Sequence, residues 1–120
     1  MTVQRKNFGS PEETRPIGNG TLDVLQFEGA SVALFTMRPG WRWSTDVKPM
    51  AGTDSCQKSH LGYVISGTLH VVTEDGTEAD VGPNDAYVVQ PGHDAWVAGE
   101  EPVVALEFES KTAAEYAKTS

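Results

Sequence analysis

Glycine and proline turns interrupt this chain at short, regular intervals, and no helix-length segment with a repeating apolar face lies among them. The segments between these turns are rich in strand-forming residues, as at 31–38, 60–65, 68–73 and 103–108. About eight or nine short strands arranged in this way are typical of a β-sandwich or barrel. The sequence therefore predicts an all-β, antiparallel fold and argues against a parallel α/β fold.

The 120 residues suit a single domain and divide into three parts. Residues 1–20 contain several glycines and prolines and few large apolar groups, so we expect an N-terminal arm that docks on the domain. Residues 21–110 carry the strands and are expected to form the barrel. The sequence KTAAEYAK within residues 111–120 predicts a short C-terminal helix.

The charge balance excludes several classes of partner. Asp and Glu number 17 against 9 Lys and Arg, a net charge of −8, which repels phosphate backbones and anionic lipids. We therefore expect neither nucleic acid nor a membrane as a partner. One cysteine cannot form an internal disulfide, no apolar run approaches the length of a membrane span, and the polar start is unlike a signal peptide. These features predict a cytoplasmic protein.

Three side chains that can bind a metal ion occupy even-numbered positions that lead into a predicted strand: Asp54, Cys56 and His60. In an extended chain they point the same way, and carboxylate, thiolate and imidazole are all metal ligands. The alternatives are a Cys56 that packs as a small hydrophobe and an Asp54 that forms a turn.

Other candidates lie further along the chain. His93 follows a Pro-Gly turn at the mouth of a strand, where it is either a metal ligand or a rim histidine paired with Asp94. His70 lies in an alternating strand with no turn beside it, so we expect it at the surface. Glu107 is expected to point outward into solvent, with an inward role as a base as the alternative.

Two indoles precede a segment, residues 44–54, that has no periodicity and is interpreted as a long loop. Trp41 and Trp43 share a face of an extended chain, where aromatic residues usually form core. For Trp43 we expect instead a place at the wall of a ligand cavity, with Tyr63 and Asp54 also lining this substrate pocket.

The motifs SHLGYVISG and PGHDAWVAG, within Pro39 to Phe108, resemble those of short cupin domains. The first cupin motif has two histidines one residue apart, then a glutamate, and a glycine seven residues beyond the glutamate. Because Gly67 is seven residues after His60, the resemblance puts His60 at the glutamate position, with Cys56 and Asp54 at the two histidine positions.

The second motif agrees less closely. Its Gly and Pro frame is present, but the expected histidine position holds Ala95, and His93 stands two residues earlier on the same strand face. The resemblance implies a single antiparallel jelly-roll β-barrel, while the usual set of three histidines and one glutamate does not carry over to this chain.

Cys56, His60 and His93 would supply one sulfur and two nitrogens, which suits zinc better than iron or manganese and leaves a fourth position open. Iron or manganese would prefer a carboxylate, which Asp54 could supply. We expect a small organic ligand inside the barrel. The protein is then either a metal-dependent enzyme, with the metal as Lewis acid, or a metal-free binding or sensing module.

The strand after His60 places Leu61, Tyr63 and Ile65 on the side opposite the candidate ligands. An apolar outer face of this kind favours a homodimer that covers one sheet or extends it by exchange of the arm.

Overall fold

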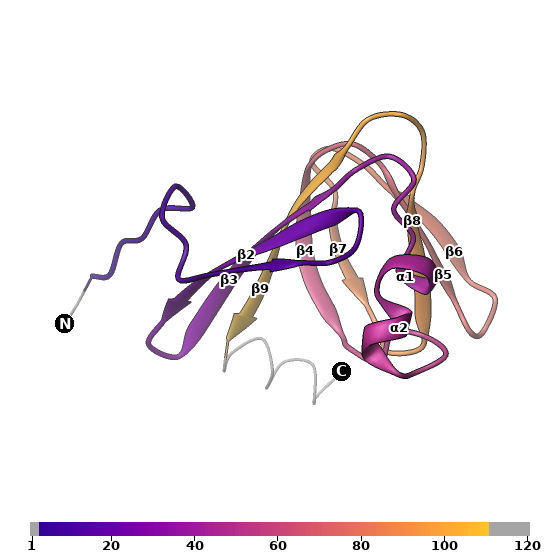
Figure 1. Cartoon of the computed structure of the whole chain (residues 1–120), viewed down its shortest axis with the longest axis horizontal. Coiled ribbons are helices and arrows are strands. Elements are labelled where there is room, and N and C mark those ends of the chain that lie inside the picture. The colour runs from indigo at the N-terminus through magenta and orange to yellow at the C-terminus, as the bar shows by residue number, and fades with distance from the viewer. Residues whose placement is uncertain (1–2, 111–120) are drawn as a thin grey trace.

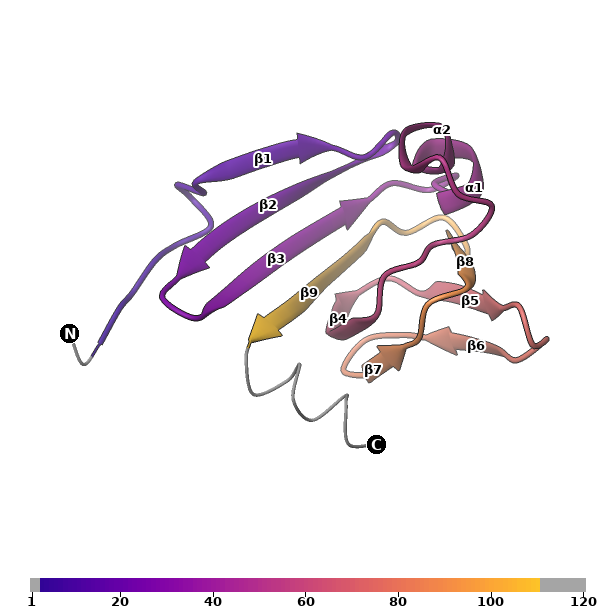
Figure 2. The ribbon, with the colours of Figure 1, turned by 90° about the horizontal axis from the view of Figure 1, so that it is seen from below.

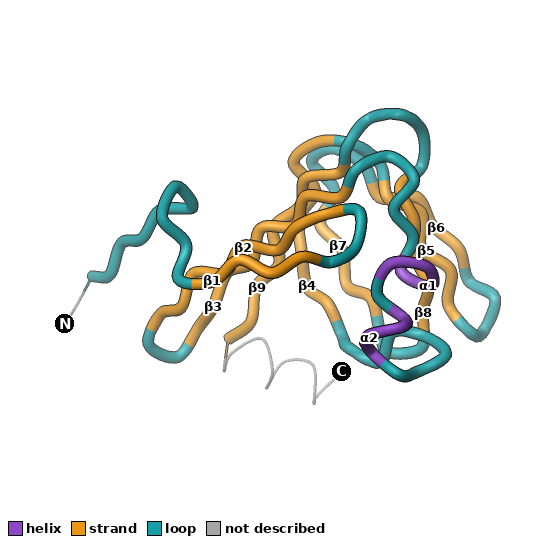
Figure 3. The backbone as a smooth tube through the Cα atoms, in the orientation of Figure 1, coloured by secondary structure: helices purple, strands orange, loops and turns teal. Residues whose placement is uncertain are grey.

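The computed structural model describes residues 3–110, and its regular secondary structure is nearly all strand (Figures 1 and 3). The elements are β1 (Glu13–Pro16), β2 (Gly20–Phe27), β3 (Ala30–Met37), α1 (Trp43–Asp46), α2 (Lys48–Ala51), β4 (His60–Ser66), β5 (Leu69–Thr73), β6 (Glu78–Val81), β7 (Ala86–Val89), β8 (His93–Val97) and β9 (Val103–Ser110).

The strands form two sheets, in the orders β1-β2-β3-β9-β4-β7 and β6-β5-β8. Every pairing in both sheets is antiparallel, which confirms the predicted all-β, antiparallel fold. In Figures 1 and 2, β4 and β7 face the three-stranded sheet, whereas β1, β2 and β3 extend away from it. The larger sheet therefore continues beyond the region where the two sheets face each other.

The core fills the space between the facing sheets. Strands β5 and β8 alternate between buried and half-buried positions, as a sheet with one inward face requires. Val64 of β4 and Val103 of β9 are the largest fully buried side chains. The core cluster also contains Met37, Trp41, Trp43, Cys56, Leu69, Val71, Tyr87, Ala95, Val97 and Ala105.

The segment 44–54, predicted as a loop, contains two short helices. The Asp46 carboxylate accepts hydrogen bonds from the backbone N–H groups of Arg42, at 2.8 Å, and Asn19, at 3.1 Å. The bond from Arg42 closes the turn of α1, and the bond from Asn19 holds this turn against the β1–β2 loop, so Trp43 begins a helix and does not continue an extended run. Gly52 ends α2 in the left-handed conformation, with φ of 74°. Local polar contacts of this kind leave no apolar periodicity in the sequence.

Part of the predicted arm is a strand, because Glu13–Pro16 forms β1 and pairs with β2. The predicted C-terminal helix falls at residues 111–120, outside the described residues. Neither α1 nor α2, the helices of the described chain, is long and apolar enough to cross a membrane.

Candidate metal centre

Three candidate ligands predicted from the sequence meet inside the barrel: Cys56, His60 and His93. Cys56 lies in the segment before β4, where its backbone N–H donates to the carbonyl of His93 at 2.8 Å, and its own carbonyl accepts from Gly92 at 2.7 Å. These bonds attach the segment to the start of β8. His60 is the first residue of β4. One potential ligand atom from each residue lies within 4.8 Å of the other two.

The cluster is shielded from solvent. Cys56 is 7% exposed and His93 is 5% exposed, while the side chain of His60 is 20% exposed. The Cys56 Sγ lies 3.5 Å from the His60 Nε2. The two imidazole rings meet edge to face, with centroids 5.0 Å apart. A thiol and two imidazoles therefore share one small, largely buried volume.

Each imidazole is held by a hydrogen bond from its outer nitrogen. His60 Nδ1 donates to Glu107 Oε1 at 2.5 Å, and His93 Nδ1 donates to the carbonyl of Gln90 at 2.7 Å. These bonds place a proton on Nδ1, so Nε2 is the nitrogen of each ring that would bind a metal. Metal-binding histidines are usually oriented in this way, by a carboxylate or a backbone carbonyl on the second nitrogen.

Glu107 points into the barrel, so its predicted outward position is wrong. Its side chain is 19% exposed, and its two oxygens accept hydrogen bonds from His60 and from the Tyr87 hydroxyl, the latter at 2.7 Å. Strand register explains the position, because Gly62 pairs with Glu107 on one side and with Tyr87 on the other. A Cβ on Gly62 would lie 2.5 Å from the Tyr87 hydroxyl. Because Gly62 has no side chain, the Tyr87 hydroxyl can reach the Glu107 carboxylate across it.

The environment shifts the acidity of all three linked groups. Burial acts to raise the pKa of the Cys56 thiol, but hydrogen bonds with His60 and His93 outweigh it and lower the pKa to about 6. Burial acts to lower the pKa of His60, but hydrogen bonds with Cys56 and Glu107 raise it to about 9. Burial, together with the Glu107 charge, raises the pKa of Tyr87. Without a metal, Cys56 and His60 therefore favour a thiolate–imidazolium pair.

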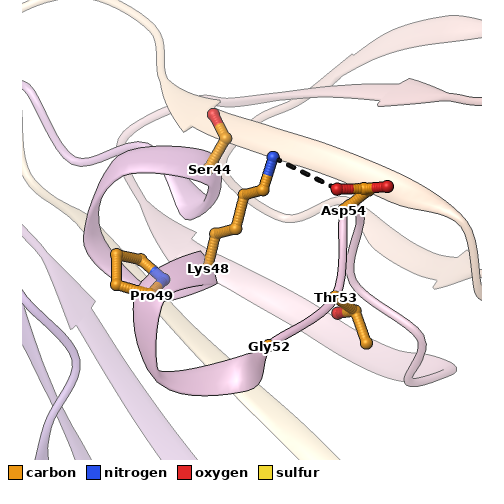
Figure 4. Close-up of a pocket in the computed structure, with 6 residues that line it drawn as sticks. All are labelled: Ser44, Lys48, Pro49, Gly52, Thr53 and Asp54. Atoms are coloured by element: carbon orange, nitrogen blue, oxygen red, sulfur yellow. Dashed lines mark ion pairs between the residues drawn. The ribbon is translucent and has the colours of Figure 1, made fainter.

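Asp54, also predicted near the ligands, lies elsewhere. Its side chain is fully exposed, and it faces Lys48 across 3.6 Å at a surface pocket of about 380 Å³ beside α1 and α2 (Figure 4). The residues from Thr53 to Ser55 form a bend, so the parity argument, which requires an extended chain, fails at Asp54.

Of the other two residues predicted to line a substrate pocket, Tyr63 points away from the three ligands, whereas Trp43 lies in the core with Cys56. The Tyr63 hydroxyl donates to the Asn84 side chain at 2.5 Å. Trp43 is 6% exposed and belongs to the same core cluster as Cys56. His70 of β5 bonds to Glu78 and Asp80, away from the three ligands, in an exposed group of polar contacts.

Solved structures similar to this one are cupins and other small proteins. No family model matches the sequence, and no curated protein matches it. A protein of unknown function from Rhizobium leguminosarum has a TM-score of 0.65 at 17% identity, covering 90% of this chain and 96% of that one. A cupin-2 domain from Rhodospirillum rubrum has a TM-score of 0.59 at 17% identity, over 92% and 76% of the two chains.

KdgF from a Halomonas species is also similar, with a TM-score of 0.57 at 16% identity, over 87% of this chain and 93% of that one. Identities this low carry information about the fold and not about the activity. One identification of the fold follows from the two antiparallel sheets, their buried interior and these similarities. The described part of the chain has the fold of the cupin superfamily.

Proposed function

We propose that this protein binds a divalent metal ion, with zinc favoured, through Cys56, His60 and His93. The carrying observation is that the three donor atoms lie within 4.8 Å of one another while both imidazoles are held through Nδ1. A thiolate with two imidazoles is a donor set that suits zinc. Iron and manganese would prefer a carboxylate, and the exposed Asp54 is turned to Lys48 instead.

The proposed site also supports a role with a small organic ligand. Three protein donors leave a fourth position for water or a ligand, as in catalytic zinc sites, where the metal supplies Lewis acidity. Glu107 would keep the His60 ring in place and hold its Nδ1 proton, and Tyr87 would satisfy the second oxygen of Glu107. These contacts support metal-dependent chemistry on a small molecule.

Metal analysis of freshly purified, untagged protein tests the proposal. We expect about one zinc ion per chain, retained through gel filtration and removed by a chelator. Protein without metal that also fails to take up added zinc would contradict the metal site. The remaining function would then be a binding or sensing module without catalysis.

At pH 9 and above, where the His60 proton no longer competes with the metal, Glu107→Gln is expected to weaken zinc binding by about 10- to 100-fold, as loss of an outer-shell carboxylate commonly does. Gln keeps the size of the side chain but accepts the His60 Nδ1 proton without a charge. Competition with a chromophoric chelator measures the affinity. Glu109→Gln, on the same strand and exposed, is the control and should bind zinc as the parent does. Equal affinities for both variants would show that Glu107 does not support the metal site.

We also propose a homodimer, in which a second copy covers the larger sheet. Within β2 and β3 only Gly20, Leu25 and Met37 are buried, so much of this part of the sheet lacks a covering layer among the described residues. Leu61 and Val88, which pair across β4 and β7, are 40% and 64% exposed. Apolar surface of this kind on neighbouring strands is typical of an interface.

Light scattering across the micromolar range should give the mass of two chains. Leu61→Glu combined with Val88→Glu should shift the protein to one chain, because two charges would lie in the interface. A single-chain mass for the parent protein would contradict the dimer. A cytoplasmic location and the lack of nucleic-acid and membrane partners remain predictions from charge and cysteine content.

A further inference from the structure

A cavity of about 500 Å³ lies along the gap between β6 and β7. These two strands are edge strands of different sheets, so the barrel is not closed by a strand pairing at this place. Apolar side chains on the inward faces of the strands and in the following turn form much of its wall: Val71, Ala79, Val81, Tyr87, Val89 and Pro91. The gap is thus an apolar opening in the side of the barrel, of a size that suits a small organic molecule.

This cavity adjoins the candidate metal centre. Thr73 and Val89, which line the cavity, are the strand partners of His93 and His60. Tyr87 forms a shared wall, because it lines the cavity and its hydroxyl donates to Glu107. The three candidate ligands do not line the cavity themselves. The cavity is therefore lined by strand neighbours of two of the three candidate ligands.

The charged groups at the cavity all carry the same sign. Glu74, Asp75 and Glu78 line it, and none of the described residues lining it is Lys or Arg. The hydroxyl of Ser55 donates to Glu74, and the backbone N–H of Thr77 donates to Asp75 at 3.0 Å, so both carboxylates are fixed at the opening. Glu78 differs from these two residues, because its carboxylate contacts His70 Nε2 at 2.8 Å on the outer face of the β5–β6 pair.

The metal centre would not offset this negative charge. The charges of a divalent ion, the Cys56 thiolate and the Glu107 carboxylate sum to zero. The carboxylates at the opening then dominate the local field, and they attract cations and repel anions.

We propose that the β6–β7 cavity admits and binds small molecules with an apolar body and a protonated amine, and that it discriminates against carboxylates and phosphates. The inference rests on the proposed function, because it assigns a ligand class to the same barrel. The apolar walls would hold the body of the molecule, and Glu74 and Asp75 would face its ammonium group at the opening.

Three probes of matched shape test the charge preference: cyclohexylmethylamine, cyclohexylmethanol and cyclohexanecarboxylate. Backbone amide shifts in NMR titrations give each affinity and show whether Val71, Val89 and Gly92 respond. At low ionic strength the amine should bind about tenfold more tightly than the carboxylate, with the alcohol between them, and high salt should shrink the difference.

The double variant Glu74→Gln and Asp75→Asn should reduce the preference for the amine at least about threefold. The matched control changes Glu100 and Glu101 to Gln in the loop between β8 and β9, where neither residue lines the cavity, and should keep the preference. Carboxylate binding as tight as amine binding, or shifts confined to residues outside the cavity, would overturn the inference.

Running the titrations on metal-free and zinc-loaded protein separates the two proposals. Amine preference in a protein that takes up no zinc would support the cavity and contradict the metal site. Zinc uptake together with a preference for the carboxylate would support the metal site and contradict the proposal for the cavity.

Discussion

His60→Ala is expected to lower zinc affinity at least about a hundredfold, so that the variant loses its metal during gel filtration. The free energy of zinc binding at a four-ligand site is about 10–16 kcal/mol, or roughly 3 kcal/mol for each ligand. Removing one of three protein donors therefore costs at least about two orders of magnitude in affinity. The change also leaves Glu107 without its imidazole partner. Metal content and chelator competition measure the effect.

His70→Ala is the matched control for this variant. Like His60, His70 is a histidine bonded to carboxylates. Its two ring nitrogens contact Asp80 at 2.6 Å and Glu78 at 2.8 Å, away from the candidate metal centre. The control should bind zinc as the parent does. If His60→Ala does not fold, His93→Ala provides a second test of the same site, since it removes a different donor. Parent-like affinity in both ligand variants would contradict the metal site.

Local patterns were sufficient to predict the fold from the sequence. Turn residues at regular intervals predicted the antiparallel strands, because Gly and Pro restrict where a strand can continue. The Asp75-Gly76 turn does join β5 to β6, and Gly67 follows β4 with φ of 77°. A Cβ at Gly67 would clash with the Pro102 carbonyl, so any larger residue is disfavoured at this position.

The grouping of Cys56, His60 and His93 could be predicted only in part. Parity correctly placed Cys56 and His60 together, and the motif frame added His93. Asp54 was misplaced because a bend precedes Cys56, and such a bend depends on local polar contacts such as the one from the Thr53 hydroxyl to the Ser55 carbonyl. Parity arguments therefore hold only as far as the chain is extended.

The inward position of Glu107 depends on register between strands far apart in sequence. Glu107 lies opposite Ala33 on one side and Gly62 on the other, and both neighbours are small. The alternation of residues within this one strand did not show the direction of Glu107, because the apolar residues beside it could face either side of the sheet. The available signal was Gly62, whose missing side chain in an apolar strand indicates close approach by another group.

Zinc affinity is expected to depend strongly on pH, with a loss of about a thousandfold between pH 9 and pH 6. In the metal-free protein the pKa of His60 is about 9 and that of Cys56 is about 6. Between these values the thiolate is ready to bind, but the metal must displace one proton from His60. The affinity should fall about tenfold for each pH unit in this range, and more steeply below pH 6, where Cys56 is protonated as well.

Two further measurements identify which group carries the displaced proton. The ultraviolet absorption of the thiolate should be present in metal-free protein at pH 7 and disappear as the pH falls through about 6. An unshifted thiol would show this absorption only in alkaline solution, and that result would contradict the thiolate–imidazolium pair. Glu107→Gln removes the charge that helps to raise the pKa of His60, so its affinity should reach a plateau below pH 9. A plateau at the parent's pH in this variant would show that Glu107 does not control the His60 proton.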